Sequence, residues 1–143
     1  MATEIAMLAL YRALGERLTS NPSSLWGLRA YGTRADDKAV PPYVVYTVAS
    51  ETQGALPNES EGLMDVSCVA ASVEESMIGA CAIDDLINNM GVQDRGTPNP
   101  LVTGSVWTCY SITREQIIHT WITTEAKIDL YVTGAKYRVN MQR

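Results

Sequence analysis

The sequence has no phenylalanine, one histidine and three cysteines, and these scarcities exclude several kinds of functional site. A lone His119 cannot form an HExxH pair or a zinc centre built from several histidines and cysteines. The cysteines Cys68, Cys81 and Cys109 form no CxxC pair and lie in apolar segments, so we expect three buried thiols. Glycine-rich phosphate loops and the GxSxG nucleophile motif are also absent. The sequence therefore predicts no metal, no cofactor and no catalytic set.

Features of membrane-spanning and secreted chains are missing as well. No apolar run approaches the ~20 residues that a membrane-spanning helix needs. The first residues carry Glu4 and lack both a basic start and a cleavage site, so they do not resemble a signal peptide. We therefore expect a soluble protein of the cytosolic type that makes no membrane contact.

Positive charge is scarce and unevenly placed. Eleven Lys and Arg residues against sixteen Asp and Glu residues give a net charge of −5, whereas proteins that bind nucleic acid usually carry a basic stripe. No lysine or arginine occurs between Glu51 and Asp94, where nine acidic residues lie. Residues 126–143 hold four basic residues against one acidic residue. Three explanations of this separation stay open: solvated faces of uneven charge, attraction between copies, and steering of a partner.

The chain is long enough for one hydrophobic core. Its 143 residues, 46% of them hydrophobic, predict a single domain spanning residues 1–143. Segments near 53–62 and 91–103 are rich in Gly, Pro, Asn and Ser, which predicts long loops. Long loops are usually functional or disordered, so we expect these two to become ordered on contact with a partner.

Two helices are expected. Apolar residues at three- and four-residue spacing predict a helix over residues 4–20, which Pro22 ends. Ser72 and Glu75 form a capping box that opens a second helix over residues 72–90. The predicted buried face of this second helix consists of Met77, Ala80, Ile83, Ile87 and Met90.

Alternating apolar and polar residues predict the strands. The expected strands are 28–32, 43–48, 63–71, 104–112, 126–132 and 136–142. Thr133-Gly134-Ala135 is expected to form a tight turn, and the connector 113–125 is rich in strand-forming residues. This alternation is typical of an antiparallel sheet with one covered face. We therefore predict an α+β fold, a two-layer sandwich in which two helices pack on one face of a mainly antiparallel sheet.

The polar residues do not suggest catalysis. Adjacent residues of a helix point about 100° apart, so Asp84 and Asp85 cannot act together as an acid–base pair. His119 lies among strand-forming residues, which favours a strand surface or an interface over a catalytic base. We therefore expect the protein not to be an enzyme.

Aromatic residues are the more informative group. Three Trp and seven Tyr residues exceed what one small two-layer core can hide from water, and protein interfaces favour both residue types. The candidate interface residues are Tyr43, Tyr46, Trp107, His119, Trp121 and Tyr131.

Four segments follow one another in a recognisable order. They are the Leu-Tyr-Arg-Ala-Leu core of the first helix (10–14), the Pro-Tyr-Val-Val-Tyr strand (42–46), the strand–helix unit DVSCVAASVEESMIGACAIDDLINNM (65–90) and the closing hairpin YVTGAKYRVNMQR (131–143). This order resembles the tail terminator family of siphophages, also called tail completion or tail-to-head joining proteins. The resemblance covers most of the chain outside the loops.

This resemblance implies a structural role in a virion. Proteins of that family form hexameric rings that cap the finished tail tube, end its polymerisation and join the tail to the head connector. The implied partners are further copies of the chain, the tail tube protein and a head-completion or connector protein. Genomic DNA would pass through the lumen without specific binding. The implied location is the tail or neck of the virion, after assembly in the cytoplasm of a bacterial host.

Two other functions remain open. The chain also fits another neck component of the virion, or a tail-tube component, which would polymerise into long tubes. It also fits a small-molecule-binding or enzymatic α+β domain, which a pocket holding His119 together with two acidic residues would favour.

A lumen crossed by DNA should repel phosphate, so we expect some of the acidic residues between 51 and 94 to line it. The candidates are Glu59, Glu61, Asp84 and Asp85. Reversing several of these charges to lysine should slow the ejection of DNA from assembled particles, because lysines would hold the phosphates. Ejection at the unaltered rate would contradict this assignment.

Overall fold

The structure, a computed structural model, describes residues 5–20, 23–36, 38–54, 56, 58–88, 99–100 and 106–143. These residues form two helices and a single sheet in the strand order β1-β2-β3-β6-β5-β4. Neighbouring strands run antiparallel, apart from the parallel pair β1 and β2. The elements are α1 (Ala6–Leu18), β1 (Ala30–Gly32), β2 (Tyr43–Gln53), β3 (Glu59–Ala70), α2 (Val73–Asn88), β4 (Asn99–Pro100), β5 (Thr108–Thr123) and β6 (Asp129–Gln142).

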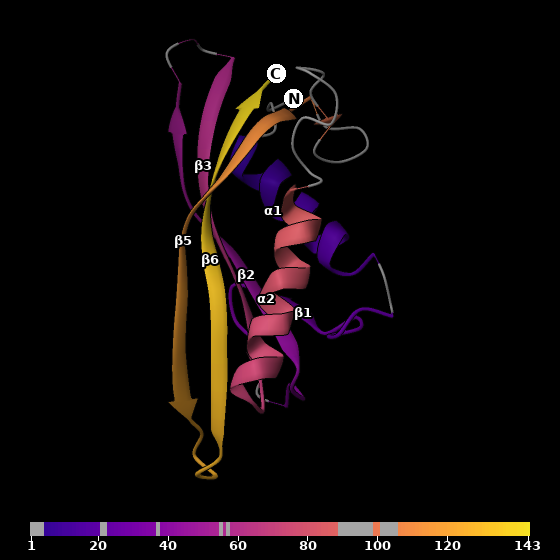
Figure 1. The fold of residues 1–143 in the computed structure, drawn as a ribbon. Coiled ribbons are helices and arrows are strands. Elements are labelled where there is room, and N and C mark those ends of the chain that lie inside the picture. Colours follow the sequence, from indigo (N-terminus) through magenta and orange to yellow (C-terminus); the bar gives the residue numbers. More distant parts are fainter. Residues whose placement is uncertain are drawn as a thin grey trace.

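Both helices lie against the same face of the sheet, which we call the inner face (Figure 1). Helix α1 packs on β2, and α2 packs on β3 and β6. On the opposite, outer face, the buried apolar side chains of the described residues form a small cluster around Tyr43, Val69 and Leu130. The predicted α+β class, with two helices on one face of a mostly antiparallel sheet, is confirmed.

The two helices begin in different ways. The Ser72 hydroxyl accepts a hydrogen bond from the Glu75 N–H at 3.2 Å, so the Ser72 half of the predicted capping box is confirmed. Helix α1 has no side-chain cap at its own N-cap residue, Ile5. Instead, the Met7 N–H donates to the carboxylate of Glu51 in β2 at 2.7 Å. This bond satisfies an otherwise unpaired amide and fixes the start of α1 on the sheet.

The main core lies between the inner face and the helices. Leu10, Leu14 and Leu18 of α1 are buried in it, and the Trp26 indole N–H donates to the Leu18 carbonyl at 2.7 Å. The sheet contributes buried residues from β2, β3 and β6, among them Met64 and Tyr137. Tyrosine, tryptophan and methionine thus fill the volume that phenylalanine would otherwise occupy.

The buried face of α2 differs from the prediction. Ser76, Gly79, Ile83 and Ile87 face the sheet, whereas Met77 is 44% exposed. Hydrophobic spacing alone assigned Met77 to the core, but small residues are required where α2 approaches the sheet. The Ser76 hydroxyl lies 2.9 Å from the hydroxyl of Thr133, which only a close helix–sheet contact allows.

The prediction of a tight turn at residues 133–135 is wrong. Strand β6 continues through these residues, and Gly134 lies between Ser67 of β3 and Ile118 of β5. A Cβ atom on Gly134 would lie 2.1 Å from the Ser67 Oγ, so this glycine permits a close approach between strands. The closing hairpin is instead β5–β6, whose turn follows Thr123 and contains Lys127 at a φ of 60°.

The expected loops also change. Residues 59–62 belong to β3, and most of the connector 113–125 belongs to β5, so both antiparallel ladders are longer than predicted. Polar residues conceal the alternation in 59–62, whereas in 117–122 apolar residues occupy both alternating sets of positions. Most of the expected loop 91–103 lies outside the described residues, except for Asn99 and Pro100 of β4, and so do Met90 and Gly91.

Helix α2 approaches the sheet closely at Gly79, and this contact yields a stability prediction. A Cβ atom on Gly79 would lie 2.2 Å from the Cys68 Sγ and 2.8 Å from its Cβ. Gly79→Ala should therefore lower the free energy of unfolding by about 1–3 kcal/mol through overpacking. In an unconstrained helix the same change stabilises by ~1 kcal/mol.

Denaturant titration measures this effect. Ile78→Ala, at the exposed neighbouring position, serves as the control and should change stability by no more than about 0.5 kcal/mol. A Gly79→Ala variant as stable as the parent protein would contradict the close packing of α2.

Candidate functional site

Within the described residues, strand β5 presents an open sheet edge. On the side of β5 that faces away from β6, β4 is the only paired strand among the described residues. Asn99 pairs with Cys109, and Pro100 pairs with Thr108. Beyond this point β5 runs to Thr123 with no further strand beside it in the described part of the chain. Together with β6 it forms a hairpin whose tip extends past the helix layer (Figure 1).

This edge carries large apolar side chains on both faces of the sheet. On the inner face, Ile117 is 54% and Trp121 is 66% exposed. They lie opposite Ala135 and Tyr131 of β6. On the outer face, Ile118 and Ile122 are exposed as well. We call Ile117, Ile118, Trp121 and Ile122 the edge patch. A long apolar edge of this kind is a template for pairing with another chain.

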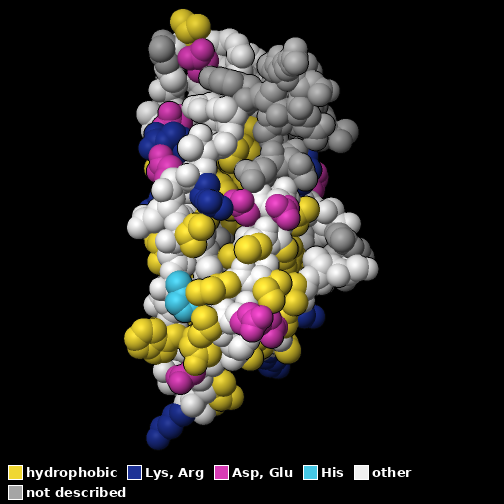
Figure 2. All heavy atoms as spheres, in the orientation of Figure 1, with side chains coloured by type: hydrophobic (Ala, Val, Ile, Leu, Met, Phe, Trp, Pro, Cys, Tyr) yellow, Lys and Arg dark blue, Asp and Glu magenta, His cyan; other side chains and the backbone are white. Residues whose placement is uncertain are grey.

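A groove adjoins the edge patch on the inner face, between α2 and the β5–β6 hairpin. It has a volume of about 420 Å³. Its apolar lining includes Met77, Ala80 and Cys81 of α2 and Ile117 of β5. Figure 2 shows the hydrophobic side chains gathered over this part of the molecule. The groove and the edge patch therefore form one continuous apolar region, since Ile117 belongs to both.

Several polar side chains of the groove bond to other groups of the same protomer. The Tyr137 hydroxyl donates to Asp84 at 2.9 Å, and Arg114 lies 3.2 Å from the same carboxylate. Burial and this hydrogen bond raise the pKa of Tyr137, so its hydroxyl stays protonated as a donor. The His119 Nδ1 lies 2.7 Å from the Thr133 hydroxyl, which also contacts Ser76. Asp85, which also lines the groove, lies beside Asp84 on α2 and is exposed.

The groove thus contains His119 and two acidic residues, the combination that would favour a small-molecule site. However, the hydrogen bond of the His119 ring is to a threonine, and Asp84 is paired with an arginine. Within the described residues, no group of three or more His, Cys, Asp or Glu side chains is placed to hold a metal ion. No described helix is long and apolar enough to cross a membrane.

The six candidate interface residues separate into two groups. Tyr43, Tyr46 and Trp107 are buried within the protomer, so they fill its own clusters and do not offer their rings to a partner. The Tyr46 ring, for example, lies 5.3 Å from that of Tyr11. His119 and Trp121 are exposed on β5, and Tyr131 is half-buried opposite Trp121. Their role as interface residues stays a prediction.

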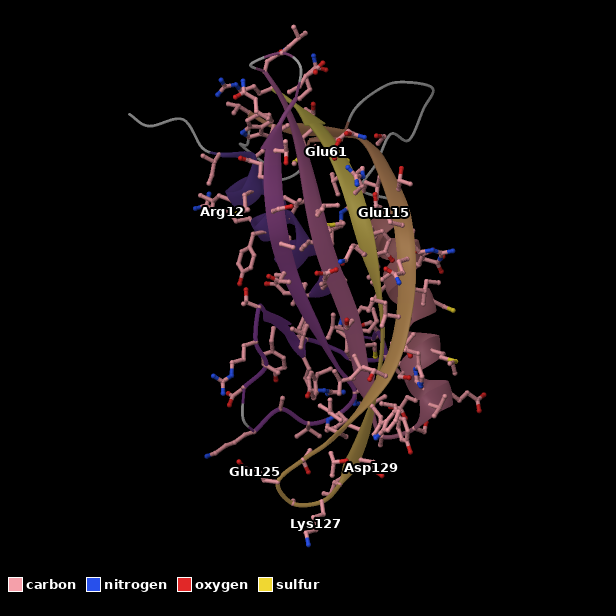
Figure 3. All side chains as sticks on the ribbon, turned by 90° about the vertical axis from the view of Figure 1, so that its left-hand side faces the viewer. Arg12, Glu61, Glu115, Glu125, Lys127 and Asp129 are labelled. Carbon is pink, nitrogen blue, oxygen red and sulfur yellow. The ribbon has the colours of Figure 1, made fainter. Side chains whose placement is uncertain are left out.

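The four candidate lumen residues lie on opposite sides of the sheet. Glu61 is on the outer face, where Arg138 of β6 bonds to both Glu61 and Glu115 and so links β3, β6 and β5 (Figure 3). Glu59 precedes it on the same strand, whereas Asp84 and Asp85 belong to α2 on the inner side. A lumen lined by a single face of the sheet would therefore include either Glu59 and Glu61 or Asp84 and Asp85, and not both pairs.

Sequence reasoning did not single out Ile117, Ile118 and Ile122. The signal was present in the segment QIIHTWI, where apolar residues occupy both alternating sets of positions. Such a strand is buried on both faces or is covered by a partner.

Comparison with known proteins supports the fold assignment. No model of a known protein family matches the sequence. The search of curated proteins also finds no match. The structure is similar to a chain in the "Virion of native gene transfer agent (GTA) particle", with a TM-score of 0.62 at 15% sequence identity. The alignment covers 98% of this chain and 100% of that chain. The likeness therefore extends over the whole fold.

The three thiols should differ in reactivity. Burial raises the pKa of both Cys68 and Cys109 to about 12, so these thiols stay protonated and unreactive at pH 8. Cys81 was expected to be buried, but it is exposed on the groove side of α2. Ellman's reagent at pH 8 should therefore modify one thiol in the folded protein and three after unfolding.

Cys81→Ser is the matched control for this measurement. It should abolish the reaction of the folded protein and leave two thiols reactive in denaturant. Rapid modification of a second thiol in the folded protein would contradict the burial of Cys68 and Cys109.

Proposed function

We propose that this protein is a structural component of a phage-like virion and works by self-association. More narrowly, we propose that it forms the tail-terminator ring that caps the tail tube and joins the tail to the head connector. The sequence resemblance to tail terminators suggests a hexamer. The proposed role is mechanical, since it requires only surfaces that bind further copies, the tube and the connector.

The edge patch is the observation that carries the proposal. Four large apolar side chains are exposed along one strand, on both faces of the sheet. Leaving such an edge in water costs hydrophobic free energy and invites uncontrolled pairing, so a stable protein must cover it. Assembly with further subunits provides this cover, and a ring does so for every copy at once.

The structural comparison supports the same class of protein. A chain of a gene transfer agent virion is similar over its full length, so a protein of this size and topology occurs in at least one phage-like particle. Because the sequence identity is low, the comparison supports the fold. The proposals of a ring and of its partners are argued from the sequence resemblance and from the edge patch.

The groove favours a second candidate function, a small-molecule-binding domain. His119, Asp84 and Asp85 share one groove of suitable size, as that alternative required. The bonds of Asp84 to Arg114 and Tyr137 and of His119 to Thr133 weaken this alternative, because these groups are occupied within the protomer.

Native mass spectrometry and negative-stain microscopy test the proposed ring. We expect a closed oligomer of uniform size that does not grow into tubes, and that blocks elongation when it is added to growing tail tubes. Long tubes of the purified chain would identify a tail-tube component instead. A chain that stays monomeric at all concentrations, and binds a small molecule in a His119-dependent manner, would support the second candidate.

A further inference from the structure

The two edges of the sheet have properties that complement one another. The pairing register runs in one continuous row from β1 to β5. Across the sheet, this row consists of Ala30, Val44, Cys68, Thr133 and His119. The short strand β1 therefore lies at the same level of the sheet as the middle of the edge patch, on the opposite edge.

The strand directions also fit. Strand β1 runs parallel to β2, and each following pair up to β5 is antiparallel, so β1 and β5 run in opposite directions. If neighbouring copies are related by a rotation axis that lies along the strands, β5 of one copy meets β1 of the next in the antiparallel arrangement. Antiparallel pairing is the more stable kind per residue.

Side chains beside β1 match the edge patch in character. Leu28 and Val40 flank β1 and the start of β2, and both are more than 60% exposed. Figure 3 looks onto the outer face and shows β2, beside which β1 pairs, on the side of the sheet away from β5. Apolar residues are therefore available on both edges at the same level.

Charge favours a contact between unlike edges. Helix α2, next to β5, carries Glu74, Glu75, Asp84 and Asp85 and no basic residue. Residues 5–40, which contain α1 and β1, carry five basic residues against three acidic ones. Asp84 is already paired with Arg114 of β5, but the other acidic residues leave helix α2 negative, whereas residues 5–40 carry a net charge of +2. A contact between β5 and β1 therefore brings fewer like charges together than a contact between two β5 edges.

We propose that the edge patch of one protomer pairs with the β1 edge, Ala30–Gly32 with Leu28 and Val40, of a second copy. The sheet then continues from copy to copy, and the contact is heterologous, so each protomer uses both edges once. This inference rests on the proposed ring and names the surfaces that close it. Strand addition supplies main-chain hydrogen bonds, and the exposed apolar side chains supply the buried area.

Two variants that each block one edge test this pairing. Variant A is Ile118→Lys with Trp121→Lys, on β5, and variant B is Leu28→Lys with Val40→Lys, beside β1. All four residues are exposed, and lysine on a sheet edge opposes pairing. Native mass spectrometry should find each variant monomeric by itself. An equimolar mixture should form a 1:1 dimer, because one unaltered β5 edge and one unaltered β1 edge remain.

The other outcomes separate the two proposals. Leu56→Lys, exposed in the turn between β2 and β3, is the matched control and should assemble like the parent chain. If the parent chain forms rings and variant A does too, the edge assignment fails and the ring stands. If variant A is monomeric while variant B assembles, the contact joins two β5 edges and the heterologous pairing fails. A monomeric parent chain overturns both proposals, and formation of the mixed dimer shows that both variants are folded.

Discussion

The structure depends on the pairing of β6 with β3 on one side and with β5 on the other. The pairing with β5 extends from Asp129 to Gln142, and the pairing with β3 extends from Tyr131 to Gln142. Tyr137, Val139 and Met141 of β6 carry the core beneath the helices, so β6 links the covered part of the sheet to the open hairpin. Past Arg114, β5 has β6 as its only strand neighbour in the described part of the chain, and its apolar side chains are left exposed as a direct consequence.

Segments whose structure depends on local features were predictable from the sequence, and segments whose structure depends on distant residues were not. Helix α2 was predictable because Ser72, Glu75 and a helical period are local features, and the class of fold followed from two helices and alternating strands. The position of Gly134 inside a strand was not predictable. Glycine occurs both in turns and in strands that another strand approaches closely, so the sequence alone does not distinguish the two. That distinction depends on Ser67, which is 67 residues away in sequence.

The candidate site shows the same limit. Composition indicated surplus aromatic residues, but burial separates Trp121 on the edge from Tyr43, Tyr46 and Trp107 inside the protomer. The residues that define the edge, Ile117 and Ile118, are ordinary core residues by composition. Their exposure is a consequence of strand order, which places β5 near the edge of the sheet, and strand order was not available from periodicity.

On the edge of the sheet opposite β5, the part of β2 that extends beyond β1 is protected from pairing. This protection limits where a second sheet can join. Beyond Tyr46, the side of β2 that faces away from β3 has no strand partner among the described residues. This part of β2 nevertheless differs in character from the edge patch. A register shift between Val48 and Ser50 distorts the edge, and polar residues follow it. The carboxylate of Glu51 is engaged by the start of α1. These features are the usual means by which a sheet avoids unwanted pairing, and they leave the level of β1 as the place where a second sheet can join. A contact restricted to one level fixes the relative height of neighbouring copies, which a closed ring requires and a loose aggregate does not.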